Sequence, residues 1–189
     1  MSKGRLEAFS DGVLAIIITI MVLELRPPNG TDWAALQAVF PRLVSYVLSF
    51  VVLGIYWNNH HHLFQAVQKV NGAILWANLH LLFWLSLIPF TTAWMGEKGF
   101  PSLSVALYGV DLLLSGFAYN LLVRKLLAHH GSNSLLARAI GKDVKGNISL
   151  ILYLTAIPSA FLFPWIAYGV YILVALIWFI PDRRIEKVL

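Results

Sequence analysis

Long apolar runs separated by short polar or basic stretches divide the chain into six segments. Their expected bounds as helices are residues 6–26, 42–67, 72–95, 102–127, 147–163 and 165–181. Each run is close to the roughly 17–25 residues that an α-helix needs to cross a hydrocarbon core of about 30 Å. The pattern therefore predicts an all-α membrane protein, with one six-helix transmembrane domain over residues 1–189.

The last two segments meet at Pro164 and can also be read as one helix. Such a helix over residues 148–180 would be roughly 50 Å long at about 1.5 Å per residue, which exceeds the hydrocarbon core. A tight hairpin at Phe163, Pro164 and Trp165 is the better interpretation, because aromatic residues are enriched at the membrane interface. Six spans are therefore expected.

The distribution of Lys and Arg predicts the orientation of these spans. With six spans, three of the fourteen basic residues lie on one side, namely Arg26, Arg42 and Lys98. The other eleven lie on the side that holds both termini: Lys3, Arg5, Lys69, Arg124, Lys125, Arg138, Lys142, Lys145, Arg183, Arg184 and Lys187. Because Lys and Arg accumulate in cytoplasmic loops, the N- and C-termini are predicted to be cytoplasmic.

Composition narrows the class of protein further. The chain is 59% hydrophobic and only 12% charged, whereas soluble domains carry about 25% charged residues. The net charge of +5 lies mainly at helix ends and sets topology, so membrane lipid is an expected partner and nucleic acid is not. The chain has no cysteine, which excludes disulfides and thiol ligands, and no metal or cofactor is expected.

The first segment carries a carboxylate, Asp11, just before an apolar run whose one polar side chain is Thr19. Ionisable groups inside a membrane are costly and by default mark a functional site, so we interpret this helix as the wall of an ion pathway. At helical spacing Ile16, Thr19, Ile20 and Leu23 form one stripe. The alternative for that stripe is a packing seam or a lipid-facing surface.

Polar residues of the first three segments fall in the same, cytoplasmic leaflet. They are Arg5, Ser10 and Asp11 in the first segment, Trp57, His60 and His61 in the second, and Asn78 and His80 in the third. Buried polar groups need partners. We therefore predict a network that supports the first helix, in which Asp11 accepts hydrogen bonds from a histidine of the second segment and from Asn78 or His80. Arg5 would lie at its cytoplasmic edge.

Two other features admit a functional and a structural interpretation. His60, His61 and His62 could suggest a metal site, but adjacent helix positions point about 100° apart and cannot converge on one ion. Asp111 lies near the middle of the fourth segment. It is either a carboxylate in an ion path or, as we prefer, a residue paired within the helix bundle.

The first half of the chain resembles a known family. The motifs are Arg5-x-x-x-Phe9-Ser10-Asp11, Trp57-x-x-His60-His61-x-x-Phe64, and Asn78 with Ile88-Pro89-Phe90-Thr91. They resemble the transmembrane protein 175 family, which comprises endosomal and lysosomal potassium channels and their bacterial relatives. Animal members carry two six-helix repeats. This chain has one, like the prokaryotic members, which implies the plasma membrane of a prokaryote.

The resemblance implies a homotetramer in which the first helix of each subunit lines a central pore for potassium ions. It also implies a hydrophobic constriction with Ile16 at its narrowest level, followed outward by Thr19 and Leu23. The sequence agrees that a carbonyl filter is missing, because no Thr-Val-Gly-Tyr-Gly type of loop occurs.

Two other classes of protein remain as alternatives. A secondary transporter or proton-coupled carrier usually has repeated halves and helices broken near the midplane, and neither is visible in the sequence. A membrane enzyme would need a nucleophile motif, a zinc-helix motif or paired carboxylates at useful spacing, and these are not found either. The chain is therefore predicted not to be an enzyme.

Overall fold

The computed structural model describes residues 2–97, 99–131, 134, 136–137 and 143–179, and within them no strand occurs. Its helices are α1 (Lys3–Leu23), α2 (Trp33–Gln65), α3 (Gly72–Glu97), α4 (Ser102–His130), α6 (Val144–Ser159) and α7 (Pro164–Phe179). The first four have the length and apolar content to cross a membrane, whereas α6 and α7 are shorter, with 16 residues each. The prediction of an all-α membrane protein is confirmed.

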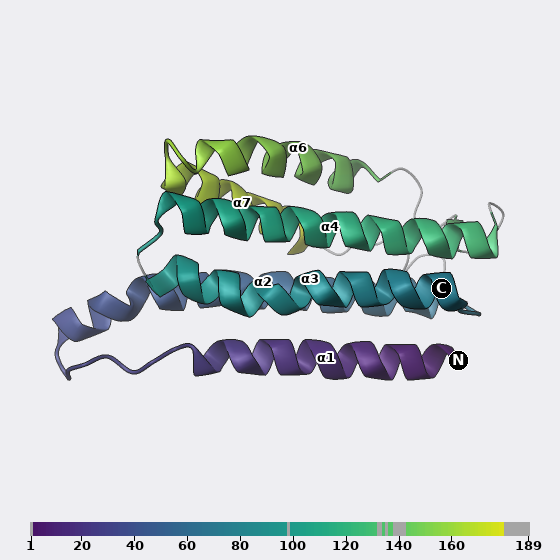
Figure 1. Ribbon diagram of the computed structural model, residues 1–189, viewed down its shortest axis with the longest axis horizontal. Coiled ribbons are helices and arrows are strands. Elements are labelled where there is room, and N and C mark those ends of the chain that lie inside the picture. Colours follow the sequence, from purple (N-terminus) through teal and green to yellow (C-terminus); the bar gives the residue numbers. More distant parts are fainter. Residues whose placement is uncertain (1, 98, 132–133, 135, 138–142, 180–189) are drawn as a thin grey trace.

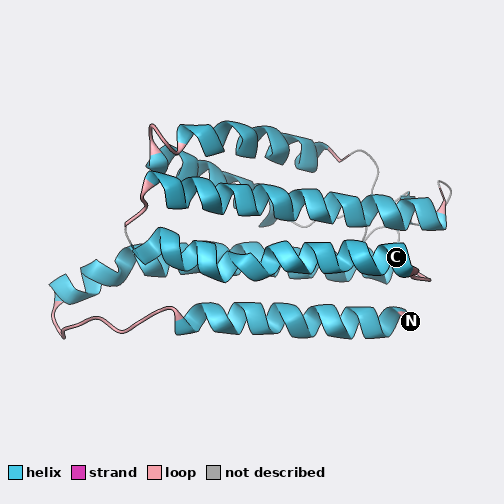
Figure 2. Cartoon of the chain, in the orientation of Figure 1, coloured by secondary structure: helices cyan, strands magenta, loops and turns pink. Residues whose placement is uncertain are grey.

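Successive helices run antiparallel, and the helices are arranged in layers (Figures 1 and 2). One edge of the bundle is formed by α1, which packs on α2 and α3. The next layer contains α4 and α7, and α6 forms the opposite edge. The most extensive packing joins α3 to α4, so these two helices connect the N-terminal and C-terminal parts of the bundle.

The longest helix, α2, begins at Trp33 and therefore well before the expected start at residue 42. Asp32 caps this end, because its carboxylate accepts a hydrogen bond from the Ala35 amide at 2.8 Å. The helix continues through Pro41, and its first turns bend away and project past the end of the bundle (Figure 1). Proline lacks an amide hydrogen and clashes with the preceding turn, which accounts for the bend.

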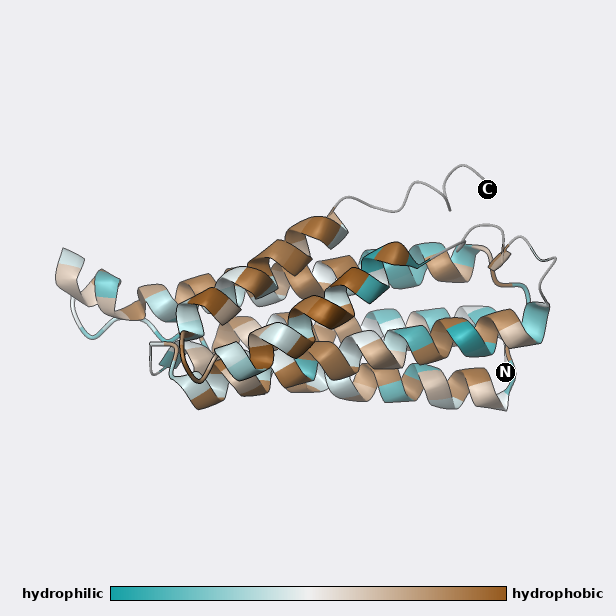
Figure 3. Ribbon diagram, turned by 90° about the horizontal axis from the view of Figure 1, so that it is seen from above, coloured by the Kyte–Doolittle hydropathy of each residue, from teal (hydrophilic) through white to brown (hydrophobic). Residues whose placement is uncertain are grey.

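The expected hairpin between the last two helices is confirmed. The turn covers residues 160–163, and α7 begins at Pro164, a residue favoured in the first turn of a helix because its missing amide hydrogen costs nothing there. Phe161, Leu162 and Phe163 are all exposed at the tip. Figure 3 shows that hydrophobic residues cover the outward faces of these helices, as lipid contact requires.

The contact between α4 and α7 is close because Gly109 has no side chain. The Tyr171 hydroxyl lies against Gly109 and donates a hydrogen bond to the Val105 carbonyl oxygen at 3.2 Å. A Cβ atom at position 109 would overlap this hydroxyl. One glycine thus allows a tyrosine to satisfy its polar atom inside the bundle.

We expect Gly109→Ala to lower the free energy of unfolding by about 1–3 kcal/mol, because the tyrosine must move and loses its hydrogen bond. Thermal unfolding of the detergent-solubilised protein measures this loss. Gly116→Ala on the same helix is the matched control, since the nearest atom to its Cβ would be the Tyr56 hydroxyl at 3.7 Å, an ordinary contact. Equal melting temperatures for the two variants would contradict the argument.

Candidate functional site

One narrow face of α1 is buried in the subunit. Its buried residues, spaced three or four positions apart, are Leu6, Ser10, Leu14, Ile17 and Met21. This spacing places them on a single stripe of the helix, and the stripe faces α2 and α3. Hydrophobic burial along it therefore fixes one side of α1 to the bundle.

The four residues expected to line a pathway lie outside this buried stripe. Ile16, Ile20 and Leu23 are 59%, 44% and 76% exposed within the subunit, and Thr19 is exposed as well. The Thr19 hydroxyl donates within its own helix, to the carbonyl oxygens of Ala15 at 2.9 Å and Ile16 at 3.0 Å. The subunit thus presents an apolar surface interrupted by one satisfied hydroxyl.

A buried polar bridge joins α1, α3 and α2. The Asn78 side-chain amide donates to the Ser10 hydroxyl oxygen at 2.9 Å, and the Asn78 carbonyl oxygen lies 2.8 Å from Nε2 of His60. These three side chains are at most 3% exposed. Each helix contributes one member, so the bridge ties the three helices together.

The direction of every bond in this bridge follows from Ser10. Its hydroxyl donates to the Leu6 carbonyl oxygen at 2.9 Å, so towards Asn78 it can only accept. Asn78 must then present its NH₂ group to Ser10 and its oxygen to His60, which makes Nε2 of His60 the donor. The donor and the acceptor of each hydrogen bond in the bridge are therefore determined.

Asp11 has a different partner from the one predicted. Its carboxylate accepts a hydrogen bond from the indole nitrogen of Trp57 at 3.1 Å, and neither a histidine nor Asn78 donates to it. The reason is geometric. Asp11 lies about 100° around the helix from Ser10, on the exposed flank of α1, whereas His60 points into the bundle.

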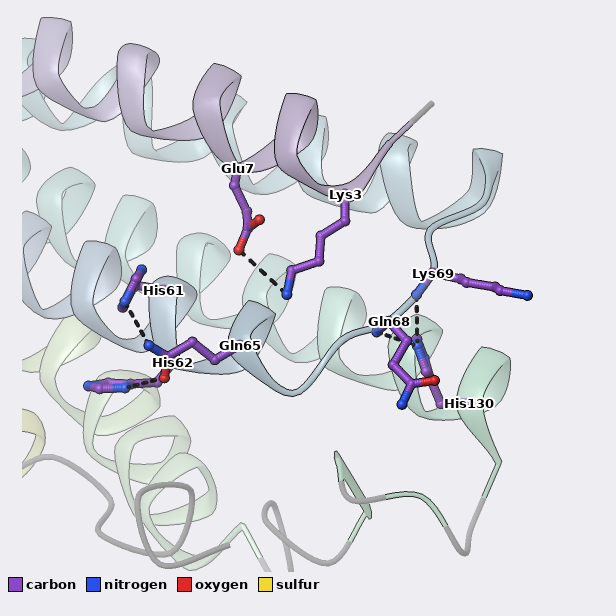
Figure 4. A network of polar contacts seen from close by, with 8 residues as sticks. All are labelled: Lys3, Glu7, His61, His62, Gln65, Gln68, Lys69 and His130. Carbon is purple, nitrogen blue, oxygen red and sulfur yellow. Dashed lines mark hydrogen bonds and ion pairs between the residues drawn. The ribbon is translucent and has the colours of Figure 1, made fainter. Parts of the chain in front are cut away.

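His80 also lies outside the bridge. It accepts a hydrogen bond from the indole nitrogen of Trp84 on its own helix at 3.0 Å. Arg5 is exposed near the start of α1, where the ion pair of Lys3 and Glu7 lies at 4.0 Å (Figure 4). Of the predicted network residues, the structure therefore joins Ser10 to Asn78 and His60, and Asp11 to Trp57, in two separate sets.

The run of three histidines separates around the helix. His60 is buried, while His61 and His62 both turn to Gln65, at 2.9 and 3.4 Å (Figure 4). Among the residues with described positions, no three His, Cys, Asp or Glu side chains come together as a metal site.

Polar contacts that the sequence did not reveal join the remaining helices. Ser49 on α2 bonds to the hydroxyls of Thr92 at 2.6 Å and Tyr108 at 3.0 Å, all of them buried. Asp111 accepts from the Thr91 hydroxyl at 3.0 Å through one carboxylate oxygen, and its other oxygen has no hydrogen-bond partner among the residues that the structure describes. Asp111 is thus paired within the bundle, as preferred above. Isolated Ser and Thr residues in apolar runs gave no signal that could have identified these contacts.

His130 joins the end of α4 to the loop between α2 and α3. Its Nδ1 lies 2.9 Å from the Leu126 carbonyl oxygen, while its Nε2 accepts from the backbone amides of Gln68 and Lys69 at 3.2 and 3.4 Å (Figure 4). The side chain thereby satisfies two backbone amides of this loop.

Comparison with known proteins identifies a family model that matches the first part of this chain and relatives that match nearly all of it. The family model for the endosomal/lysosomal potassium channel TMEM175 matches residues 5–89. A potassium channel of Chryseobacterium sp. is 59% identical over 187 residues, which cover 99% of this chain and 97% of that protein. A crystal structure of a lysosomal potassium-selective channel TMEM175 homolog from Chamaesiphon minutus superimposes with a TM-score of 0.82 at 27% identity, and covers 95% of this chain and 97% of that one.

Animal relatives match less of their own length. The human endosomal/lysosomal proton channel TMEM175 is 40% identical over 86 residues, which are 39% of this chain and 17% of the human protein. The similarity to the animal proteins therefore concerns a part of each.

We expect Asn78→Leu to destabilise the protein by about 1–3 kcal/mol, because an apolar side chain of similar size leaves the Ser10 oxygen and the His60 Nε2 buried without partners. Equilibrium unfolding in detergent measures the loss. Trp57→Phe is the comparison, since it removes a bond to an exposed carboxylate that water can replace. The effect of Ser10→Ala combined with Asn78→Leu should be smaller than the sum of the single effects. Strict additivity would argue against a continuous bridge.

Proposed function

The chain belongs to the family of the endosomal/lysosomal potassium channel TMEM175, and on that premise we propose that it forms a potassium-permeable channel. Four subunits surround a central axis, and α1 of each lines the pore. The observation that carries the proposal is the exposed face of α1, which bears Ile16, Thr19, Ile20 and Leu23 on the side opposite to the subunit core. The near full-length relatives named as potassium channels support the choice of ion.

The position of α1 at the edge of the bundle suits a pore helix. It packs on α2 and α3, and no helix among the described residues covers its other side (Figure 1). Four such edges brought together would enclose an axis, which one subunit alone has too little polar lining to do. The fixed buried stripe would keep the same residues at the axis in every subunit.

The chemistry of this face fits a constriction without a carbonyl filter. Rings of Ile16 and Leu23 would form dry levels that gate by dewetting, and they favour ions that shed water at low cost. Between these rings, the Thr19 proton is held by its own backbone. The lone pairs of its hydroxyl oxygen would thus be available to a cation that has lost part of its hydration shell.

Orientation and location follow from the same proposal. Both termini are cytoplasmic, as the basic residues predict, and the channel lies in the plasma membrane of a prokaryote. A secondary transporter is the alternative, but a pore helix that runs unbroken from Lys3 to Leu23 differs from the interrupted helices of such transporters.

We expect Ile16→Asn to raise single-channel conductance and to bring potassium over sodium discrimination towards unity, because a polar ring hydrates the narrowest level. Recordings in planar bilayers under potassium/sodium bi-ionic conditions measure both quantities. Ile151→Asn is the matched control, since Ile151 is a similarly exposed isoleucine, at 62%, on α6. If Ile16→Asn leaves conductance and selectivity unchanged, Ile16 does not line the constriction.

Potassium efflux from potassium-loaded liposomes separates a channel from a carrier. A channel conducts down the potassium gradient without a coupled ion, so an imposed proton gradient should not be required. Flux that saturates at carrier rates and depends on the proton gradient would replace this proposal with the proton-coupled carrier.

The assembly can be tested independently of conduction. Four chains of 21.2 kDa give a complex of about 85 kDa, which native mass spectrometry resolves from a monomer or dimer. A monomer that still conducts after reconstitution would refute the shared pore.

A further inference from the structure

A cavity of about 300 Å³ lies on the other side of the bundle from α1. It is lined by residues of α2, α4, α6 and α7, together with Asp143 at the start of α6. Its volume is at the lower end of the range for small-ligand sites, roughly 300–1,000 Å³. None of the residues proposed to line the pore borders it.

The cavity lining changes from polar to apolar along its length. Towards the end of the bundle where the chain begins, it is bordered by Asn59, Asn120, Arg124, Asn147 and Ser149. Further along the same helices, its lining residues are Val52, Ile55, Leu113, Phe117, Leu150, Tyr153, Val174 and Ala175. All four helices contribute residues to the apolar part, so the change from polar to apolar lining is shared by the four helices.

Two aromatic side chains that border this space, Tyr119 and Trp178, have their polar atoms bonded to other residues of the lining. The Tyr119 hydroxyl donates to the Asn59 carbonyl oxygen at 3.2 Å, and the Trp178 indole nitrogen donates to the Ser149 hydroxyl at 2.9 Å. The Asp143 carboxylate at the polar end accepts from the Gly146 amide at 2.9 Å. Arg124 makes no ion pair with any residue whose position is described.

The length and depth of the cavity match one leaflet of a bilayer. From Arg124 to Leu113 the helix rises roughly 16 Å at about 1.5 Å per residue. Half of a hydrocarbon core of about 30 Å is roughly 15 Å. A molecule with its charged group beside Arg124 and its chain beside Leu113 would have the orientation of a lipid in the cytoplasmic leaflet of the proposed topology.

We propose that this cavity holds one acyl chain of an anionic phospholipid of that leaflet, with its phosphate paired to Arg124. A guanidinium binds phosphate oxygens through two parallel hydrogen bonds, and basic pockets between transmembrane helices are suited to anionic headgroups. The apolar walls accept the chain, which removes hydrocarbon-lined empty space that water does not fill. The site is formed by residues of one subunit and is separate from the residues proposed to line the pore.

Native mass spectrometry of the purified protein in detergent tests this site, with phosphatidylglycerol or phosphatidylcholine of identical chains added as the probe. We expect one phosphatidylglycerol per subunit, retained at about fivefold lower concentration than phosphatidylcholine, because the choline cation of the latter neutralises its phosphate and weakens the attraction to Arg124. Arg124→Gln should abolish this preference. Lys125→Gln is the matched control, since Lys125 is also an exposed cation on the same turn but does not border the cavity.

A second pair of variants tests the apolar part of the cavity, where the acyl chain is proposed to bind. Gly116→Phe places a ring in the cavity and should displace both lipids, whereas Gly116→Ala adds a methyl group at an ordinary contact distance and should retain them. Ala175→Phe fills the same space from α7 if Gly116→Phe does not fold. The proposal is overturned if lipid retention is unchanged in the filled variants, or if Arg124→Gln and Lys125→Gln lower it equally.

Discussion

A hydroxyl, amide or imidazole that enters the hydrocarbon region must find its partner within the protein, because lipid offers none. The arrangement of the first three helices depends on this constraint at the bridge of Ser10, Asn78 and His60. Each member has one geometry that satisfies its neighbours, so a shift of any one helix leaves at least two buried polar groups unpaired. The apolar stripe of α1 gives the packing energy, but leucine and isoleucine would tolerate several rotations of the helix. The bridge selects one.

The rotation of α1 decides which residues face away from the subunit. A shift of register by one residue turns a helix by about 100°. It would carry Ile16 into the flank of the bundle and bring Ala15 outward. The polar bridge therefore acts on the proposed pore without touching it, since it holds the opposite face. Asp11 and Trp57 add a second contact on the exposed flank, where water can compete for the carboxylate.

Much of the fold was predictable because a membrane allows few solutions. Apolar runs of sufficient length gave the six helices, and Pro164 gave the hairpin. The start of α2 was not predictable, since Pro41 and the polar residues before it are typical of a loop, and only the cap by Asp32 and the surrounding packing sustain the extra turns. In the candidate site, leaflet depth correctly grouped Ser10 with Asn78 and His60. It could not assign the partner of Asp11, because depth fixes height along a helix and says nothing of rotation.

The contacts that escaped prediction connect the two parts of the bundle. Ser49 with Thr92 and Tyr108, and Thr91 with Asp111, join α2 and α3 to α4, the helix that also borders the lipid-sized cavity. An occupant of that cavity does not border α1, so it can influence the pore only through its neighbours: through α2, which borders the cavity and packs on α1, or through α4 and these hydrogen bonds. The family model ends at residue 89, within α3, and so covers the side chains that must match one another in polarity and position. Tyr108 and Asp111 lie beyond it, so the match covers the bridge that orients α1 and not the hydrogen bonds that reach α4.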